Sequence, residues 1–189
     1  MENLALHPAI DNGKRTGEKI FSGGKLFCHC PSEKVEVTIT RGSSHNHLCG
    51  CSACWKPTGA LFSQVAVVPT DSLEVTENNH KLVVTNALAA IQRHACKDCG
   101  VHMYGRVNNP DHHYFGIDFV HLELAKNSGS AQIEFAGYVS SLIESGVTPS
   151  DATAIRERLA EQGLAFYDTM SPELMDVIAY HKRKIVRTG

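Results

Sequence analysis

Seven cysteines stand in three short-spaced groups within this 189-residue chain, and none follows Cys99. The groups are a C-x-C pair, a C-x-C-x-x-C trio and a C-x-x-C pair followed by glycine: Cys28 and Cys30; Cys49, Cys51 and Cys54; Cys96 and Cys99. An odd number of cysteines rules out a complete set of intramolecular disulfides. No basic and apolar secretory signal follows Met1, so we expect a reducing, cytoplasmic location, where clustered cysteines usually bind metal or perform catalysis.

The cysteine spacing predicts metal sites. Two sulfurs that are one or two residues apart on a turn can both reach one ion at about 2.3 Å, and sulfur-rich sets suit zinc. The common ferredoxin spacings are absent, so an iron–sulfur cluster is the weaker alternative, as is a redox dithiol. We expect two zinc ions per chain. The two outer pairs would form a closed structural site, and the trio would leave the open position of a catalytic site. Other partitions stay open, including one in which a histidine completes the trio.

Charge and hydropathy exclude several classes of protein. Lys plus Arg number 18 and Asp plus Glu number 20, which gives a formal charge of −2. This balance argues against a nucleic-acid partner and against a zinc-ribbon protein that binds nucleic acid. No apolar run approaches the length of a membrane span, so we also expect no membrane partner.

Short apolar and alternating runs predict a mainly β fold. They fall at 34–40, 60–68, 73–76, 81–86, 91–96, 101–107 and 114–120. No crossover helix separates them, so we expect an antiparallel domain of about eight short strands. The runs at 73–76 and 81–86 flank Asn78-Asn79, a turn signal, and are expected to form a hairpin.

The pattern becomes helical after residue 127. Apolar spacing predicts a helix over 131–145 and a second one from Pro149 to Gly163 with Ser150 as the N-cap. A third is expected to start at Ser171-Pro172-Glu173. The domain prediction is therefore a zinc-binding β domain over 1–127 and a C-terminal helical extension over 128–189, packed on the same domain.

Several runs outside the cysteines are also distinctive. They are His45 to Pro57, Phe62 to Val65, Gln92 to His94, His102 to Arg106 and Asp118 to His121. Together with the cysteine pattern they resemble the glutathione-dependent formaldehyde-activating enzyme family, nearly end to end. The resemblance implies a zinc-stapled, antiparallel Mss4-like (β-tent) fold. It also implies the carbon–sulfur lyase activity of S-(hydroxymethyl)glutathione synthase, with glutathione and formaldehyde as partners and formaldehyde detoxification as the role.

The resemblance also assigns the cysteines, in agreement with their spacing. It implies structural zinc ligands at Cys28, Cys30, Cys96 and Cys99, and catalytic zinc ligands at Cys49, Cys51 and Cys54. An open zinc site would turn the incoming thiol into a thiolate, because a coordinated thiol loses its proton. We favour this over polarisation of the carbonyl by zinc. So many thiolates need a nearby cation, and the candidates for substrate contact are Lys56, Arg93 and Arg106, with Trp55 as a pocket wall.

Five histidines lie near cysteines: His29, His45, His47, His94 and His102. We predict His47 and His94 as catalytic acids for the developing alkoxide, with hydrogen bonding in the core or around the metal as the alternative for each. A second function hypothesis is a non-catalytic protein that binds glutathione or carries formaldehyde, since thiols add to formaldehyde without an enzyme. The oligomeric state stays open, a homo-oligomer included.

Overall fold

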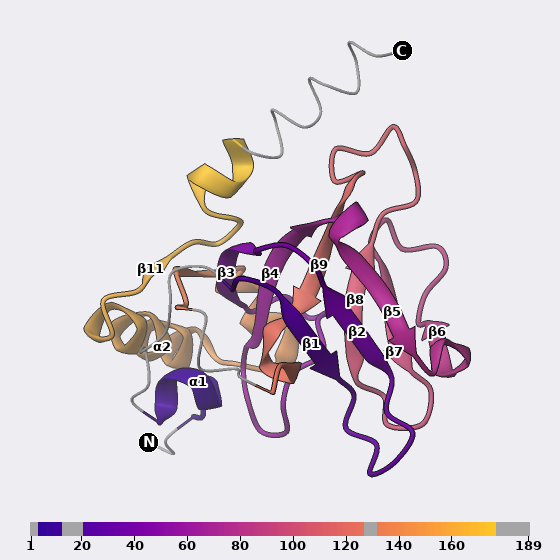
Figure 1. Ribbon diagram of the computed structural model, residues 1–189. Helices are drawn as coiled ribbons and strands as arrows, with labels where there is room; N and C mark the ends of the chain where they lie inside the picture. The colour runs from indigo at the N-terminus through magenta and orange to yellow at the C-terminus, as the bar shows by residue number, and fades with distance from the viewer. Residues whose placement is uncertain (1–3, 13–20, 127–131, 177–189) are drawn as a thin grey trace.

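The computed structural model describes residues 4–12, 21–126 and 132–176, which form two β-sheets with helices at one end (Figure 1). The larger sheet has eight strands in this order: β11 (Ala165–Phe166), β10 (Phe135–Gly137), β3 (Ser44–Cys49), β4 (Ser63–Pro69), β9 (Ile117–His121), β8 (His102–Arg106), β7 (Gln92–Cys96) and β6 (Leu82–Val84). The smaller sheet has three: β1 (Gly24–Phe27), β2 (Glu36–Ile39) and β5 (Leu73–Glu77). All neighbours are antiparallel except β10, which runs parallel to β3 and β11. The predicted mainly β, antiparallel fold is confirmed.

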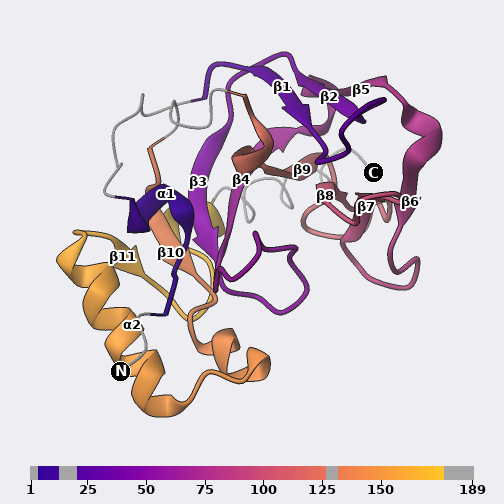
Figure 2. The same ribbon diagram turned by 90° about the horizontal axis from the view of Figure 1, so that it is seen from below.

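The main core lies between the two sheets. Figure 2 shows the three-stranded sheet lying over one face of the larger sheet. Leu26, Val37 and Ile39 of the smaller sheet pack in one cluster with Ala66 and Val120 of the larger one. Side chains alternate along a strand, so this core uses only one face of β4 and β9. Their other face is left for the site described below.

The helices cover the β3–β10 end of the larger sheet. They are α1 (Pro8–Asp11), α2 (Pro149–Glu161) and the 3₁₀ helix η5 (Ser140–Ser145). Three further 3₁₀ helices lie elsewhere, each directly after a strand or before the next one: η1 (Thr70–Ser72), η2 (Asn79–Lys81) and η3 (Leu122–Leu124). On α2, Ile155 and Leu159 are buried in a cluster with Leu48 of β3. The Arg158 guanidinium joins α2 to α1 through Asp11, 3.0 Å away. Within the described residues, no helix has the length and apolar character that a membrane span requires.

The helix predicted over 131–145 is wrong for residues 132–139, and in the described part of that range only the short 3₁₀ helix η5 at its end is helical. The chain instead forms β10 and then η5. The residues before β10 are tied to β3, because the Asn46 N–H donates to the Glu134 carboxylate at 3.1 Å and the Glu134 N–H donates to the Asn46 carbonyl at 2.8 Å. The apolar spacing of a segment this short is compatible with a helix or a strand, and the hydrogen bonds to β3 favour the strand.

The second predicted helix is present as α2, with a different cap. The side chain of Thr148, not Ser150, accepts the Asp151 N–H at 3.2 Å. The third predicted helix is present from residue 172 to 176, and its remainder lies outside the described residues. The division into domains 1–127 and 128–189 stays a prediction.

The predicted hairpin between 73–76 and 81–86 is wrong. Both strands and the turn exist, but β5 pairs with β2 in the smaller sheet and β6 pairs with β7 in the larger one. Asn78 adopts a left-handed conformation with φ 54°, and η2 follows it. The turn therefore moves the chain from one sheet to the other, and a turn signal cannot show which strand the next one will join.

A buried ion pair lies between β8 and β9. The Asp118 side chain is 0% exposed, and it accepts two hydrogen bonds from the Arg106 Nε at 2.9 and 3.2 Å and another from Arg106 Nη2. Thr70 Oγ1 donates to the same carboxylate at 3.2 Å. Arg106 thus neutralises a carboxylate that is fully removed from water.

Replacing Arg106 by methionine should therefore lower the free energy of unfolding by about 3–5 kcal/mol, the usual cost of leaving a buried charge without its partner. Urea unfolding would measure it. The matched control is Arg41→Met, whose pair with Asp71 at 3.5 Å is exposed and should cost no more than about 1 kcal/mol. Equal losses in the two variants would contradict a structural role for Arg106.

Candidate functional site

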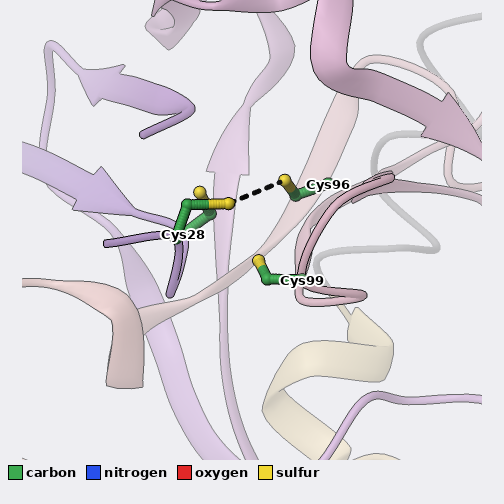
Figure 3. A group of neighbouring side chains, drawn as sticks. Cys28, Cys96 and Cys99 are labelled. Carbon is green, nitrogen blue, oxygen red and sulfur yellow. Dashed lines mark hydrogen bonds between the residues drawn. The ribbon is translucent and has the colours of Figure 1, made fainter. Parts of the chain in front are cut away.

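Four cysteine sulfurs meet where the two sheets come together. Cys28 and Cys30 lie on the loop between β1 and β2, Cys96 ends β7, and Cys99 lies on the turn into β8. The four sulfurs are all within 4.8 Å of one another, and those of Cys30 and Cys96 are 3.6 Å apart. In Figure 3 the side chains of Cys28, Cys96 and Cys99 point toward a common centre. The structure thus brings together the two outer cysteine pairs, which were predicted to form one metal site.

The backbone around these cysteines fixes the direction of their sulfurs. The Gly100 N–H donates to the Cys96 carbonyl at 2.8 Å, and the Cys96 N–H donates to the Val101 carbonyl at 2.9 Å. Gly100 has φ 73°, a left-handed conformation that favours glycine. On the other side, the Val35 N–H points at the Cys28 sulfur at 3.2 Å. Both turns therefore present their sulfurs to the same space.

The cysteine trio forms a second group at the end of β3. Cys49 is buried, and Cys51 and Cys54 lie on the loop that follows. The Cys54 sulfur is 3.1 Å from that of Cys51 and 3.7 Å from that of Cys49. The loop turns closely against β10, since a Cβ atom at Gly50 would lie 2.5 Å from the Tyr138 carbonyl oxygen. Glycine at position 50 is therefore a steric requirement of the trio.

Both groups fit a thiophilic metal ion. Zinc–sulfur bonds of about 2.3 Å in a tetrahedron place the sulfurs about 3.8 Å apart, near the 3.6 and 3.7 Å separations seen in the two groups. The shorter Cys51–Cys54 separation would have to open slightly. Hydrogen bonding within the trio lowers the pKa of the Cys51 thiol and raises the pKa of Cys49, so Cys51 is the thiol of the trio that most readily becomes a thiolate. No histidine joins the trio in the described ranges, so there it offers three ligands.

A cavity of about 250 Å³ opens beside the trio. All three of these cysteines line it, together with apolar side chains from β4, β9 and the C-terminal part: Val65, Phe119 and Met170. Ile91, just before β7, completes the apolar wall. The cavity therefore joins a sulfur-rich corner to a largely apolar interior.

Strand register explains which other residues reach the cavity. Val65 is paired with His47 on one side and with His121 on the other. Gly105 is paired with Arg93 and with Phe119. Residues that lie directly opposite on neighbouring strands share a face. Two rows of side chains therefore cross the sheet under the cavity, and every member of both rows lines it.

Of the three predicted cations, the structure places one in the cavity. Arg93 lines it, and its Nη1 donates to the Ile91 carbonyl at 3.0 Å. Lys56 instead donates to the Cys51 carbonyl at 2.9 Å and supports the trio's loop. Arg106 is held by Asp118 and is not part of the lining. Contacts of all three with a substrate stay predictions.

The two predicted catalytic histidines lie in different places. His47 lines the cavity, its ring stacks on Phe135, and its Nδ1 donates to the His45 carbonyl at 2.7 Å. Burial lowers the pKa of His47 to about 4, and its Nε2 makes no hydrogen bond with any residue that the structure describes. His94 is stacked on Tyr104 instead, with ring centroids 4.3 Å apart. It follows Arg93 on β7 and so faces away from the cavity.

Trp55 lies between the two cysteine groups. Its ring meets His29 edge-on at 5.4 Å and His121 edge-on at 6.1 Å, measured between ring centroids. It is not part of the cavity lining. The contact with substrate predicted for Trp55 therefore remains untested, and the observed contacts are those of a residue that packs over the metal loop.

Two polar residues of the cavity were missed as site candidates. His121 ends β9, and Tyr138 follows β10 with an unusual φ of 56°. Besides its place in the run from Asp118 to His121, the sequence signal for His121 is its spacing of two from Phe119, which places both on one face of a strand. No pattern indicates Tyr138, because its position depends on how β10 joins the sheet.

The family comparison and the comparison with named relatives agree with one another. The sequence model of the family described as glutathione-dependent formaldehyde-activating enzyme matches residues 25–136. Three fungal proteins provisionally named as such enzymes align over 93% of this chain. They come from Phaeosphaeria nodorum (57% identical, 92% of that protein), Pyrenophora teres f. teres (54%, 92%) and Talaromyces marneffei (52%, 94%). A crystal structure of a Rhodobacter sphaeroides protein is 18% identical, with a TM-score of 0.43, over 76% of this chain and 99% of that one.

The two cysteine groups should respond differently to mutation. Replacing Cys51 by serine should lower bound metal from two ions to about one while the fold is kept. Replacing Cys99 by serine should unfold the β domain, because a structural metal site contributes folding free energy directly. Metal analysis and thermal unfolding of both purified variants would measure this. If both variants lost the same metal and the same stability, the division into four and three ligands would be wrong.

Stability should fall in mild acid because two histidines are held neutral. Burial lowers the pKa of both His47 and His102 from 6.5 to about 4. Between these values the unfolded chain binds more protons than the folded one, so the free energy of unfolding rises with pH there and is lost as pH falls. Urea unfolding between pH 7 and pH 4 would test this, and His102→Gln should flatten the dependence. A pH-independent free energy across this window would contradict the assignment.

Proposed function

Because this chain belongs to the glutathione-dependent formaldehyde-activating enzyme family, we propose that it joins glutathione to formaldehyde and forms S-(hydroxymethyl)glutathione. This is the activity of a carbon–sulfur lyase that works in the direction of synthesis, at the first step of formaldehyde detoxification. The observation that carries the proposal is the cysteine trio on the wall of an apolar cavity that also contains one cation.

Zinc is the metal that the proposal assigns to both cysteine groups. The four-cysteine group has the closed ligand set of a structural site, whereas the trio leaves one position open. When bound there, zinc would supply the acidity that converts a coordinating thiol into a thiolate. The chain's own residues then have to position that thiol, balance its charge and keep water away from it.

Arg93 is the residue that balances the charge. Three cysteine thiolates outweigh the charge of one zinc ion, and a substrate thiolate adds a further negative charge. Arg93 is the cation that the described residues place on the cavity wall. Its guanidinium can also bind a carboxylate of glutathione through two hydrogen bonds. We therefore assign Arg93 to substrate binding.

The apolar wall of the cavity contributes by keeping water away from the reacting groups. Val65, Ile91, Phe119 and Met170 line the cavity among the polar groups. Excluding water strengthens the electrostatic interactions made inside a site. The wall also leaves room for a small carbonyl compound beside the sulfur.

Location and partners complete the proposal. We propose a reducing, cytoplasmic location, in which unpaired cysteines such as these seven are stable. The formal charge of −2 argues against nucleic acid as a partner. Glutathione and formaldehyde are the proposed partners, and a homo-oligomer is compatible with everything described.

Catalysis should exceed the spontaneous reaction between the two substrates. We expect adduct formation, followed by NMR with ¹³C-labelled formaldehyde at equal free thiol, to rise in proportion to catalytic amounts of the metal-loaded protein. Cys51→Ser should remove the excess rate. If the protein bound glutathione or its adduct and gave no excess rate, it would be a carrier and not an enzyme.

Loss of the cavity cation should weaken thiol binding. Replacing Arg93 by methionine should raise the KM for glutathione about tenfold, the effect expected for one charged hydrogen-bonding partner. Steady-state kinetics would measure it, with Arg41→Met as the control that removes an exposed arginine far from the lining. An unchanged KM in Arg93→Met would argue against this role.

A further inference from the structure

His121 is the second histidine on the cavity wall, and its setting differs from that of His47. It ends β9 in the row with Val65, and the residue is 4% exposed. Its ring is held edge-on by Trp55 at 6.1 Å and by His102 at 6.3 Å, measured between ring centroids. The imidazole thus has one orientation, facing the space that the cysteine trio also lines.

A buried carboxylate contacts this histidine from behind. His121 Nδ1 lies 3.3 Å from Glu123 Oε1, and the two side chains are 6% and 8% exposed. The same oxygen accepts the backbone N–H of Gln64 at 3.1 Å, which fixes the carboxylate in place. A carboxylate can only accept hydrogen bonds, so His121 Nδ1 carries the proton. This leaves the unprotonated Nε2 for a ligand in the cavity.

The neighbouring histidines do not share this arrangement. His47 donates to a backbone carbonyl, which carries no net charge to stabilise an imidazolium. Burial lowers the pKa of His102 to about 4 and also lowers the pKa of His7, which lies near Glu123. These groups remain neutral around His121. In the described residues, His121 is the histidine that combines a place on the cavity wall with a carboxylate partner.

We propose that His121, oriented by Glu123, transfers the proton from the attacking thiol to the aldehyde oxygen. Nε2 first accepts the thiol proton, and the sulfur electron pair forms the C–S bond while the C=O π bond breaks. The imidazolium, stabilised by Glu123, then returns the same proton to the new alkoxide. The proton that leaves sulfur ends on oxygen, so no further reactant is needed and His121 returns to its starting state. This inference rests on the function proposed above.

Removal of the imidazole tests the proposal. After subtraction of the spontaneous rate, His121→Ala should reduce kcat about a hundredfold, as is usual for loss of an acid–base group, with little change in the KM for glutathione. Added imidazole should restore part of the rate. His121→Asn provides a second variant, because its amide can still donate to Glu123 but has no basic nitrogen. The matched control is His80→Gln, an exposed histidine of η2 outside the lining, and it should keep the wild-type kcat.

Glu123 is a positioning residue in this scheme and has its own test. Glu123→Gln keeps an acceptor for Nδ1 but removes the charge that stabilises the imidazolium, so kcat should fall about tenfold with an unchanged KM. Histidine ¹H–¹⁵N spectra of the wild type should show His121 with its proton on Nδ1, a result that requires no turnover.

The outcomes distinguish failure of the proposed function from failure of the role proposed for His121. A wild-type protein without excess rate would overturn the proposed function and this inference with it. An active wild type with His121→Ala and His121→Asn equally active would overturn the inference alone. A proton on Nε2 of His121, or no rescue by imidazole in a folded and metal-loaded His121→Ala, would also contradict it.

Discussion

The four-cysteine group joins the two sheets, and the site is built around that junction. Cys28 belongs to the loop after β1 of the smaller sheet, whereas Cys96 belongs to β7 of the larger one. A metal bound here would hold together segments far apart in the chain, and such a link stabilises the fold most because it closes a long loop. Trp55 extends the junction, because it follows Cys54 and packs against His29 and His121. These contacts of Trp55 hold the loop of the cysteine trio close to the four-cysteine group.

One face of the larger sheet packs in the main core, and the other face carries the candidate site. Ala66 and Val68 of β4 point into the core between the sheets, while Val65 lies under the cavity. On β9, Val120 points into the core between the sheets, while His121 lines the cavity. Residues of the cavity can therefore be polar without opening the main core, and most of the binding wall comes from strands, which hold side chains more rigidly than loops do.

Sequence patterns predicted the parts of the structure that depend on near neighbours. The cysteine groups follow from spacing because their sulfurs project from short turns, and most strands follow from alternation. Strand β3 was missed because His45, Asn46 and His47 hide its alternation, although Asn46 is satisfied by Gln64 and by the segment before β10. The positions of Arg93, His94 and His121 required the register between strands. A single sequence does not contain that information, since a shift of one residue exchanges the two faces.

The size of the cavity limits what it can accept. Its volume of about 250 Å³ is below the usual range for small-molecule pockets, and its walls are mainly apolar. A carboxylate placed deep inside would need a charged partner, and the described lining provides only Arg93. Under the proposed function, the peptide thiol would insert its sulfur and methylene group, one carboxylate would reach Arg93, and its other charged groups would stay toward the rim. Ile91 and Gly105 both line the cavity and pack closely, because a Cβ atom at Gly105 would lie 2.9 Å from the Ile91 Cγ2, so a larger residue at position 105 would disturb this wall. Under the proposed function, a small and mainly apolar cavity of this kind would favour a small carbonyl compound over a bulky one.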